Sequence, residues 1–245
     1  MPVMDEFREE REAIKNSSFS YKLKYFWDYY KWFVIGGVLA IFIIVSIAKD
    51  VMNAKDFIFN GVLLNTFGDD ALMQEFCDNF AEEAQLDTEN YDVFMDTSLR
   101  LELSSYDEGS RATLTRVMAY LSIGDLDFII ADPAVFEYYA TSSTFYDLTQ
   151  ILTAEQLEAL KPYFYYVDQA EISRRMESTE EYVAKEYDHS NPESMESPLL
   201  VGLYIHETPK VSTTFVFKDN KAVIGIPNST QRLETALKFI DYIFE

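Results

Sequence analysis

The sequence predicts an α/β protein that has an N-terminal transmembrane helix and an outward domain with a mainly parallel β-α-β-α-β sheet. Two observations carry this prediction: an uncharged run of 17 residues at 32–48, and three apolar strand-like runs that alternate with helical patterns after residue 56. Hydrophobic residues make up 48 % of the 245, which is too many for a disordered chain. We expect a cytoplasmic arm at 1–24, a membrane-interface segment with the transmembrane helix at 25–53, and an extracytoplasmic α/β domain at 54–245.

The run at 32–48 is long enough to cross a bilayer as a helix, so the lipid bilayer is the first expected partner. Aromatic and basic residues suited to the membrane interface precede it, and we expect four of them to anchor the helix: Trp27, Tyr30, Lys31 and Trp32. Lysines before the run outweigh those after it, which predicts a single-pass protein of the cell membrane with a cytoplasmic N-terminus and an extracellular C-terminal domain. A signal peptide cleaved after Ala48 and a buried soluble helix are the alternatives.

Charge and composition exclude several classes of function. Residues 57–245 hold 34 acidic and 12 basic side chains, and such a surface is unsuited to nucleic acid. The single cysteine, Cys77, excludes an internal disulfide, and its place on an apolar helix face predicts a core residue. Neither of the two histidines lies in a metal or nucleophile motif. We therefore expect no metal, no cofactor and no enzymatic activity.

The first half of the outer domain shows strand and helix patterns in strict alternation. Apolar or alternating runs predict strands at 57–65, 91–103 and 126–131, and one-sided apolar spacing predicts a helix at 70–86 and another that ends before Gly124. Short connections between such elements favour parallel strands joined by right-handed crossovers.

The second half is less regular. Its expected elements are a short helix through 136–139, a helix that begins with a capping box at 153–156, a strand at 163–167, a charged helix at 170–187, an exposed loop at 188–198, a strand at 198–205, a hairpin at 213–226 and a final helix from 233.

Two segments of the outer domain resemble a known family. Residues 124–140 (GDLDFIIADPAVFEYYA) with 145–152 (FYDLTQIL), and residues 221–244 (KAVIGIPNSTQRLETALKFIDYIF), are similar to extracellular solute-binding proteins of the type II periplasmic-binding class. Because only 189 residues follow residue 56, the resemblance implies a reduced form of that two-lobed fold. The N-terminal residues 5–15 and 21–36 also resemble a group of uncharacterised single-pass membrane proteins of Gram-positive bacteria.

In open α/β sheets a ligand binds beyond the carboxyl ends of the strands. We place the candidate ligand-binding residues, all of them polar, at this edge of the sheet: Asn65, Thr66, Asp96, Thr97, Asp132, Asn228 and Ser229. The same residue types cap helices and form turns, so capping is the alternative for each of them.

The pattern is compatible with two functions. The first is recognition of a small polar ligand or a peptide outside the membrane, as an accessory to a membrane protein partner such as a transporter or a sensor. The second is a non-enzymatic structural or assembly role, in which the domain keeps the solute-binding-like fold without a ligand. A cleft at the strand ends would favour recognition, whereas a filled strand-end surface with an exposed apolar patch would favour assembly.

Overall fold

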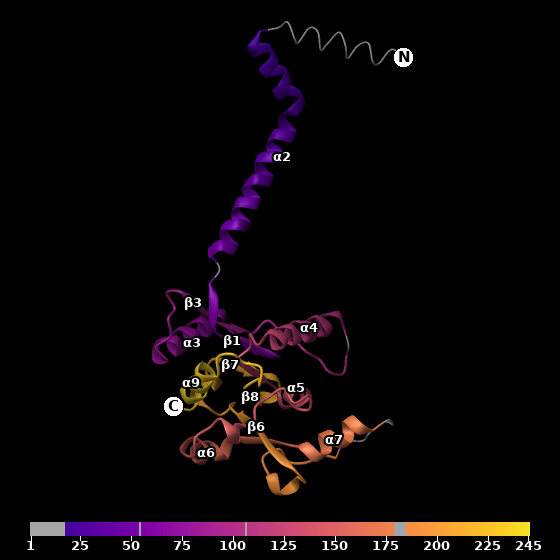
Figure 1. Ribbon diagram of the computed structural model, residues 1–245, viewed down its shortest axis with the longest axis vertical. Helices are drawn as coiled ribbons and strands as arrows, with labels where there is room; N and C mark the ends of the chain where they lie inside the picture. Colours follow the sequence, from indigo (N-terminus) through magenta and orange to yellow (C-terminus); the bar gives the residue numbers. More distant parts are fainter. Residues whose placement is uncertain (1–17, 54, 106, 179–184) are drawn as a thin grey trace. The chain divides into compact units, whose positions relative to one another are not determined.

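The computed structural model of the protein describes residues 18–53, 55–105, 107–178 and 185–245 (Figure 1). Residues 1–17 of the predicted N-terminal arm and residues 179–184 of the predicted charged helix at 170–187 lie outside the described residues. The chain divides into two compact units, Met1–Ala54 and Lys55–Glu245, and each is described by itself.

The described part of the first unit is the long helix α2, Phe19–Asn53, drawn in indigo in Figure 1. Its segment Tyr30–Lys49 is 20 residues long and predominantly apolar, and none of its most apolar window is buried, which suits a helix that crosses a membrane. The expected anchor residues lie at the start of this segment or one turn before it, and the rings of Trp27, Tyr30 and Trp32 are exposed. Because α2 begins at Phe19, the last residues of the arm belong to the same helix as the apolar segment.

The second unit is built on a six-stranded sheet of order β3-β1-β4-β8-β6-β5. Its strands are β1 Asp56–Leu63, β3 Tyr91–Asp96, β4 Phe128–Ala131, β5 Phe164–Asp168, β6 Pro198–Tyr204 and β8 Val223–Gly225. The predicted β-α-β-α-β order is confirmed, because α3 (Asp70–Glu83) connects β1 to β3 and α4 (Glu108–Ile123) connects β3 to β4, with all three strands parallel.

The prediction of a mainly parallel sheet is wrong, because the sheet is mixed. Strand β8 runs antiparallel to both β4 and β6, and β6 runs antiparallel to β5. The predicted hairpin at 213–226 is also wrong, because the two strands in this segment, β7 (Phe215–Phe217) and β8, pair with other strands and not with each other. Strand β7 pairs with β2, Thr66–Gly68, in a separate two-stranded ribbon directly after β1. The chain therefore reaches β8 from the carboxyl edge of β1 and must run back along the sheet.

The remaining described helices are α5 Pro133–Ala140, α6 Ala154–Leu160, α7 Gln169–Glu177, the short α8 Pro209–Ser212 and α9 Leu233–Phe244. Single 3-10 turns occur at Leu148–Gln150, Lys161–Tyr163, Pro192–Ser194 and Lys218–Asn220. The predicted capping box is confirmed at the start of α6, where Thr153 and Gln156 bond each other's backbone N–H.

Side chains that alternate along the strands fill a core on each face of the sheet. On β1, Phe59 and Leu63 pack with α3 and α9, which lie side by side in Figure 1. Val62 of β1 and Leu64, directly after the strand, pack with α4 and α5 on the other face. Cys77 of α3 is buried in the first core, as predicted, and burial followed by the charge of Asp78 raises the pKa of its thiol to about 12. Helices on both faces are the arrangement expected when a central strand such as β1 is buried on both sides.

Candidate functional site

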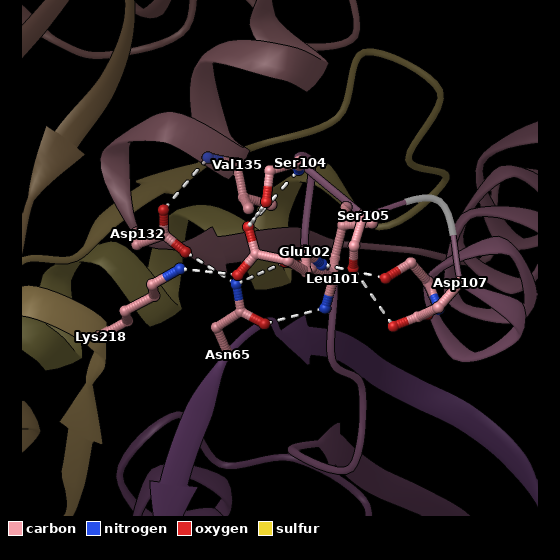
Figure 2. A network of polar contacts seen from close by, with 10 residues as sticks. Asn65, Leu101, Glu102, Ser104, Ser105, Asp107, Asp132, Val135 and Lys218 are labelled. Carbon is pink, nitrogen blue, oxygen red and sulfur yellow. Dashed lines mark hydrogen bonds and ion pairs between the residues drawn. The ribbon is translucent and has the colours of Figure 1, made fainter.

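The centre of the sheet has a topological switch point at its carboxyl edge. Strands β1 and β4 are parallel neighbours, but the chain leaves β1 towards α3 on one face and leaves β4 towards α5 on the other. Ligands of open α/β sheets bind in the crevice between such strands. Asn65 and Asp132 follow these two strands, and the structure brings them together: Asn65 Nδ2 donates a hydrogen bond of 2.9 Å to Asp132 Oδ2 (Figure 2).

Asn65 also fastens the segment after β3 to the end of β1. Its Nδ2 donates to the Leu101 carbonyl at 2.8 Å, and its Oδ1 accepts from the Leu101 N–H at 2.8 Å. The residue has a φ of 55°, a left-handed conformation that asparagine tolerates better than most residues. Both amide hydrogens of Asn65 are therefore used inside the protein, and the crevice at the switch point is bridged.

Capping and local bonding account for the other predicted residues at this edge. The N-cap of α5 is Asp132, whose Oδ1 accepts from the Val135 N–H at 3.2 Å. Asp96 accepts two hydrogen bonds from Ser98 and lies 3.1 Å from Nη2 of Arg116. The Thr66 hydroxyl donates a hydrogen bond to the Leu64 carbonyl. The Thr97 hydroxyl donates one to Met73 Sδ.

The prediction that Asn228 and Ser229 belong to the same site is wrong. Gly225, at the end of β8, pairs with Ile129 near the start of β4. Residues 228 and 229 therefore lie at the amino edge of the parallel strands, because β8 runs antiparallel to them. There Asn228 Nδ2 donates to the Ser143 carbonyl at 2.8 Å, which stabilises a loop contact.

An open cleft of about 560 Å³ lies beside the bridged switch point. It is bounded by β2, the segment after β3, the first turn of α4 and the turn after β7. Its lining residues are Asn65, Phe67, Ser98, Arg100, Leu101, Glu102, Asp107, Gly109, Ser110, Thr113 and Lys218. Of the predicted residues, Asn65 alone lines this cleft.

Fixed charges of both signs line the cleft. Lys218 Nζ lies 3.0 Å from Glu102 Oε2, and this hydrogen bond lowers the pKa of Glu102 (Figure 2). Asp107 is the N-cap of α4 and accepts from the Ser110 N–H at 2.7 Å, which lowers the pKa of Asp107. Both carboxylates therefore stay ionised at neutral pH. The Arg100 guanidinium lies 4.6 Å from the centre of the Phe67 ring and adds a second cation.

Four residues of the cleft were not predicted from the sequence: Phe67, Arg100, Glu102 and Lys218. The prediction of one strand over 91–103 hid the segment after Asp96, which is irregular in the structure. The sequence contained one signal, a single arginine between two leucines at 99–101. In the structure both leucines are buried and Arg100 is exposed. An exposed cation between two buried apolar residues marks a chain that runs along a surface.

A comparison of the chain with models of protein families, with curated proteins and with solved structures found no match. Within the described ranges, no group of three or more His, Cys, Asp or Glu side chains is arranged to hold a metal ion. The chemistry of the cleft is therefore the basis for proposing a function.

Proposed function

We propose that the outer domain recognises a small polar ligand or a peptide in the cleft beside β2 and α4. The observation that supports recognition is the lining itself, where two cations, two carboxylates and the exposed ring of Phe67 surround one open space. The described lining contains no histidine, which is the most common base in such sites. These features suit binding better than nucleophilic catalysis, which needs a base beside the nucleophile.

The same proposal places the domain outside the cell and attaches it to the membrane through α2. Lys22, Lys24 and Lys31 precede or open the apolar segment, which favours a cytoplasmic N-terminus. The described strands of the outer unit form one sheet and one ribbon within a single compact unit, so we propose an open recognition surface of reduced solute-binding type. Such a surface would serve a transporter or a sensor partner in the same membrane.

Filling the cleft should abolish binding. A Cβ atom on Gly109 would lie 3.5 Å from Asp107 Oδ1, an ordinary contact, so Gly109→Trp should place a large ring in the cleft without displacing the backbone. We expect some member of a library of sugars, amino acids, peptides and divalent ions to raise the melting temperature of the full-length protein in detergent. That rise should disappear in Gly109→Trp.

Gly109→Ala is the matched control and should keep the full rise, because a methyl group leaves the cleft open. A rise that persists in Gly109→Trp would place the ligand elsewhere. A folded protein that responds to no member of the library would favour the assembly role. That alternative is supported by the bridged switch point and by the neighbouring ribbon residues Phe67 and Val216, each of which is 58 % exposed.

The proposed orientation of the chain across the membrane can be tested with single introduced cysteines. Cys77 is buried and its thiol pKa is raised to about 12, so it should react very slowly with maleimides, which need the thiolate. In intact cells a membrane-impermeant maleimide should label Ser142→Cys, an exposed position of the outer unit, and should not label Ser18→Cys until the membrane is permeabilised. The reverse pattern would contradict the proposed orientation.

A further inference from the structure

Arg100 is held in a fixed position at the rim of the cleft. Its Nη1 donates to the Thr97 carbonyl at 2.6 Å and to the Leu99 carbonyl at 3.0 Å, and its guanidinium stacks over the Phe67 ring. Since two carbonyls and a ring already restrain the Arg100 side chain, this side chain loses little additional rotamer entropy when a ligand binds to it.

The positive charge of Arg100 has no carboxylate partner among the described residues. Three of the other five arginines of this domain do have one: Arg116 lies against Asp96, Arg174 against Glu171 and Glu196, and Arg232 against Asp125 and Asp127. Arg111 and Arg175 are likewise without an ion pair among the described residues, so the restraint on Arg100 is what distinguishes it from them. Residues 57–245 hold 34 acidic side chains against 12 basic ones, so carboxylates are plentiful in this domain. A restrained arginine that lacks a carboxylate partner is therefore a candidate to bind an anion from outside the protein.

The geometry of the guanidinium indicates which atoms are available. Both hydrogen bonds of Arg100 come from Nη1, so Nε and Nη2 donate no hydrogen bond within the described part of the chain. Adjacent N–H groups of this kind form the fork that binds the two oxygens of a carboxylate or a phosphate. Lys218, which also lines the cleft, is already engaged by Glu102, so it offers a less direct partner for a second anion.

We propose that Arg100 binds an oxyanion of the ligand, a carboxylate or a phosphate, through the edge formed by Nε and Nη2. This inference rests on the proposed recognition function and specifies its ligand class. The neighbouring carboxylates of Glu102 and Asp107 would repel a ligand with several negative charges, so the fitting ligand carries one oxyanion at Arg100 and is neutral or positive elsewhere.

The test compares acid and amide forms of one probe on the full-length protein in detergent. Binding of alanyl-alanine, alanyl-alanine amide and inorganic phosphate is measured by NMR line broadening and saturation transfer. We expect the free acid or phosphate to bind at least about tenfold more tightly than the amide, because a charge-assisted hydrogen bond is lost with the amide. Arg100→Gln should remove this preference, and Arg100→Lys should restore only part of it, since lysine lacks the fork.

Arg175→Gln is the matched control, because it removes one exposed positive charge on α7, outside the cleft lining. An equal loss of binding in that variant would show a general charge effect and would overturn the proposal, as would equal affinity for acid and amide. Failure of both acid and phosphate to bind at about 10 mM, a concentration that detects even millimolar affinity, would also overturn it. Binding that Gly109→Trp abolishes and Arg100→Gln leaves unchanged would overturn the role of Arg100 but preserve the proposed function.

Discussion

Replacing Gly61 with alanine is expected to destabilise the α/β unit Lys55–Glu245 by about 3 kcal/mol or more, which is a large part of the stability of a typical domain. Gly61 lies in the middle of β1, and a Cβ atom there would lie 1.9 Å and 2.0 Å from two ring atoms of Phe128. That ring is wholly buried and stacks on Phe239 with 4.6 Å between the ring centres. It therefore has no space into which to move. Urea unfolding of the full-length protein, followed by circular dichroism, measures the change.

Two further variants distinguish this collision from a general effect of alanine. Gly109→Ala adds the same methyl group at an exposed helix position, where alanine favours the helix by about 1 kcal/mol relative to glycine, so no loss is expected. Adding Phe128→Leu to Gly61→Ala makes room for the new methyl group and should recover part of the loss. Unfolding of Gly61→Ala at the urea concentration of the unaltered protein would contradict the packing of β1 against β4.

Replacing Asn65 with alanine is expected to cost about 3–5 kcal/mol, because at least two buried polar groups lose their partner. The Leu101 N–H and carbonyl would no longer be bonded by the Asn65 amide, and Asp132 Oδ2 would lose a donor. The φ of 55° adds strain for alanine but not for glycine, so Asn65→Gly should be about 1 kcal/mol more stable than Asn65→Ala. Urea unfolding of both variants measures the two contributions separately: the loss in Asn65→Gly reports the missing hydrogen bonds, and the further loss in Asn65→Ala reports the backbone strain.

Asn65→Asp tests the same contact through its pH dependence. It would place a second carboxylate beside Asp132, which is 6 % exposed, and two adjacent carboxylates raise the pKa of one of them. Because that pKa would be higher in the folded than in the unfolded state, the stabilisation belongs to the protonated form and is lost as pH rises. The variant should therefore become more stable relative to the unaltered protein as pH falls from 7 towards about 4. A difference that does not vary with pH would show that the two residues do not meet.

Patterns of neighbouring residues were sufficient to predict many of the helices and strands. The uncharged run at 32–48 lies within one helix, the alternation of strands and helices from residue 56 to residue 131 is present, and Thr153 begins a helix with a capping box. Each of these features depends on residues a few positions apart, where side-chain periodicity and capping chemistry act directly. Asn65 and Asp132 could be named as candidates for the same reason, since both lie at the carboxyl ends of strands in one β-α-β-α-β unit. The switch point between them was not predicted, because it depends on the two faces to which α3 and α5 pack.

The cleft and the direction of β8 depend on contacts between distant parts of the chain. An apolar run such as 223–225 has the same pattern whether the strand is parallel or antiparallel, so its residues do not reveal which edge of the sheet Asn228 and Ser229 reach. That direction follows from the pairing of β7 with β2, whose residues are far apart in the chain. The ion pair across the cleft joins Glu102 to Lys218, 116 positions apart. Residue patterns within a single segment therefore specify helices, strands and caps, whereas the cleft exists only because tertiary packing brings four separate segments together.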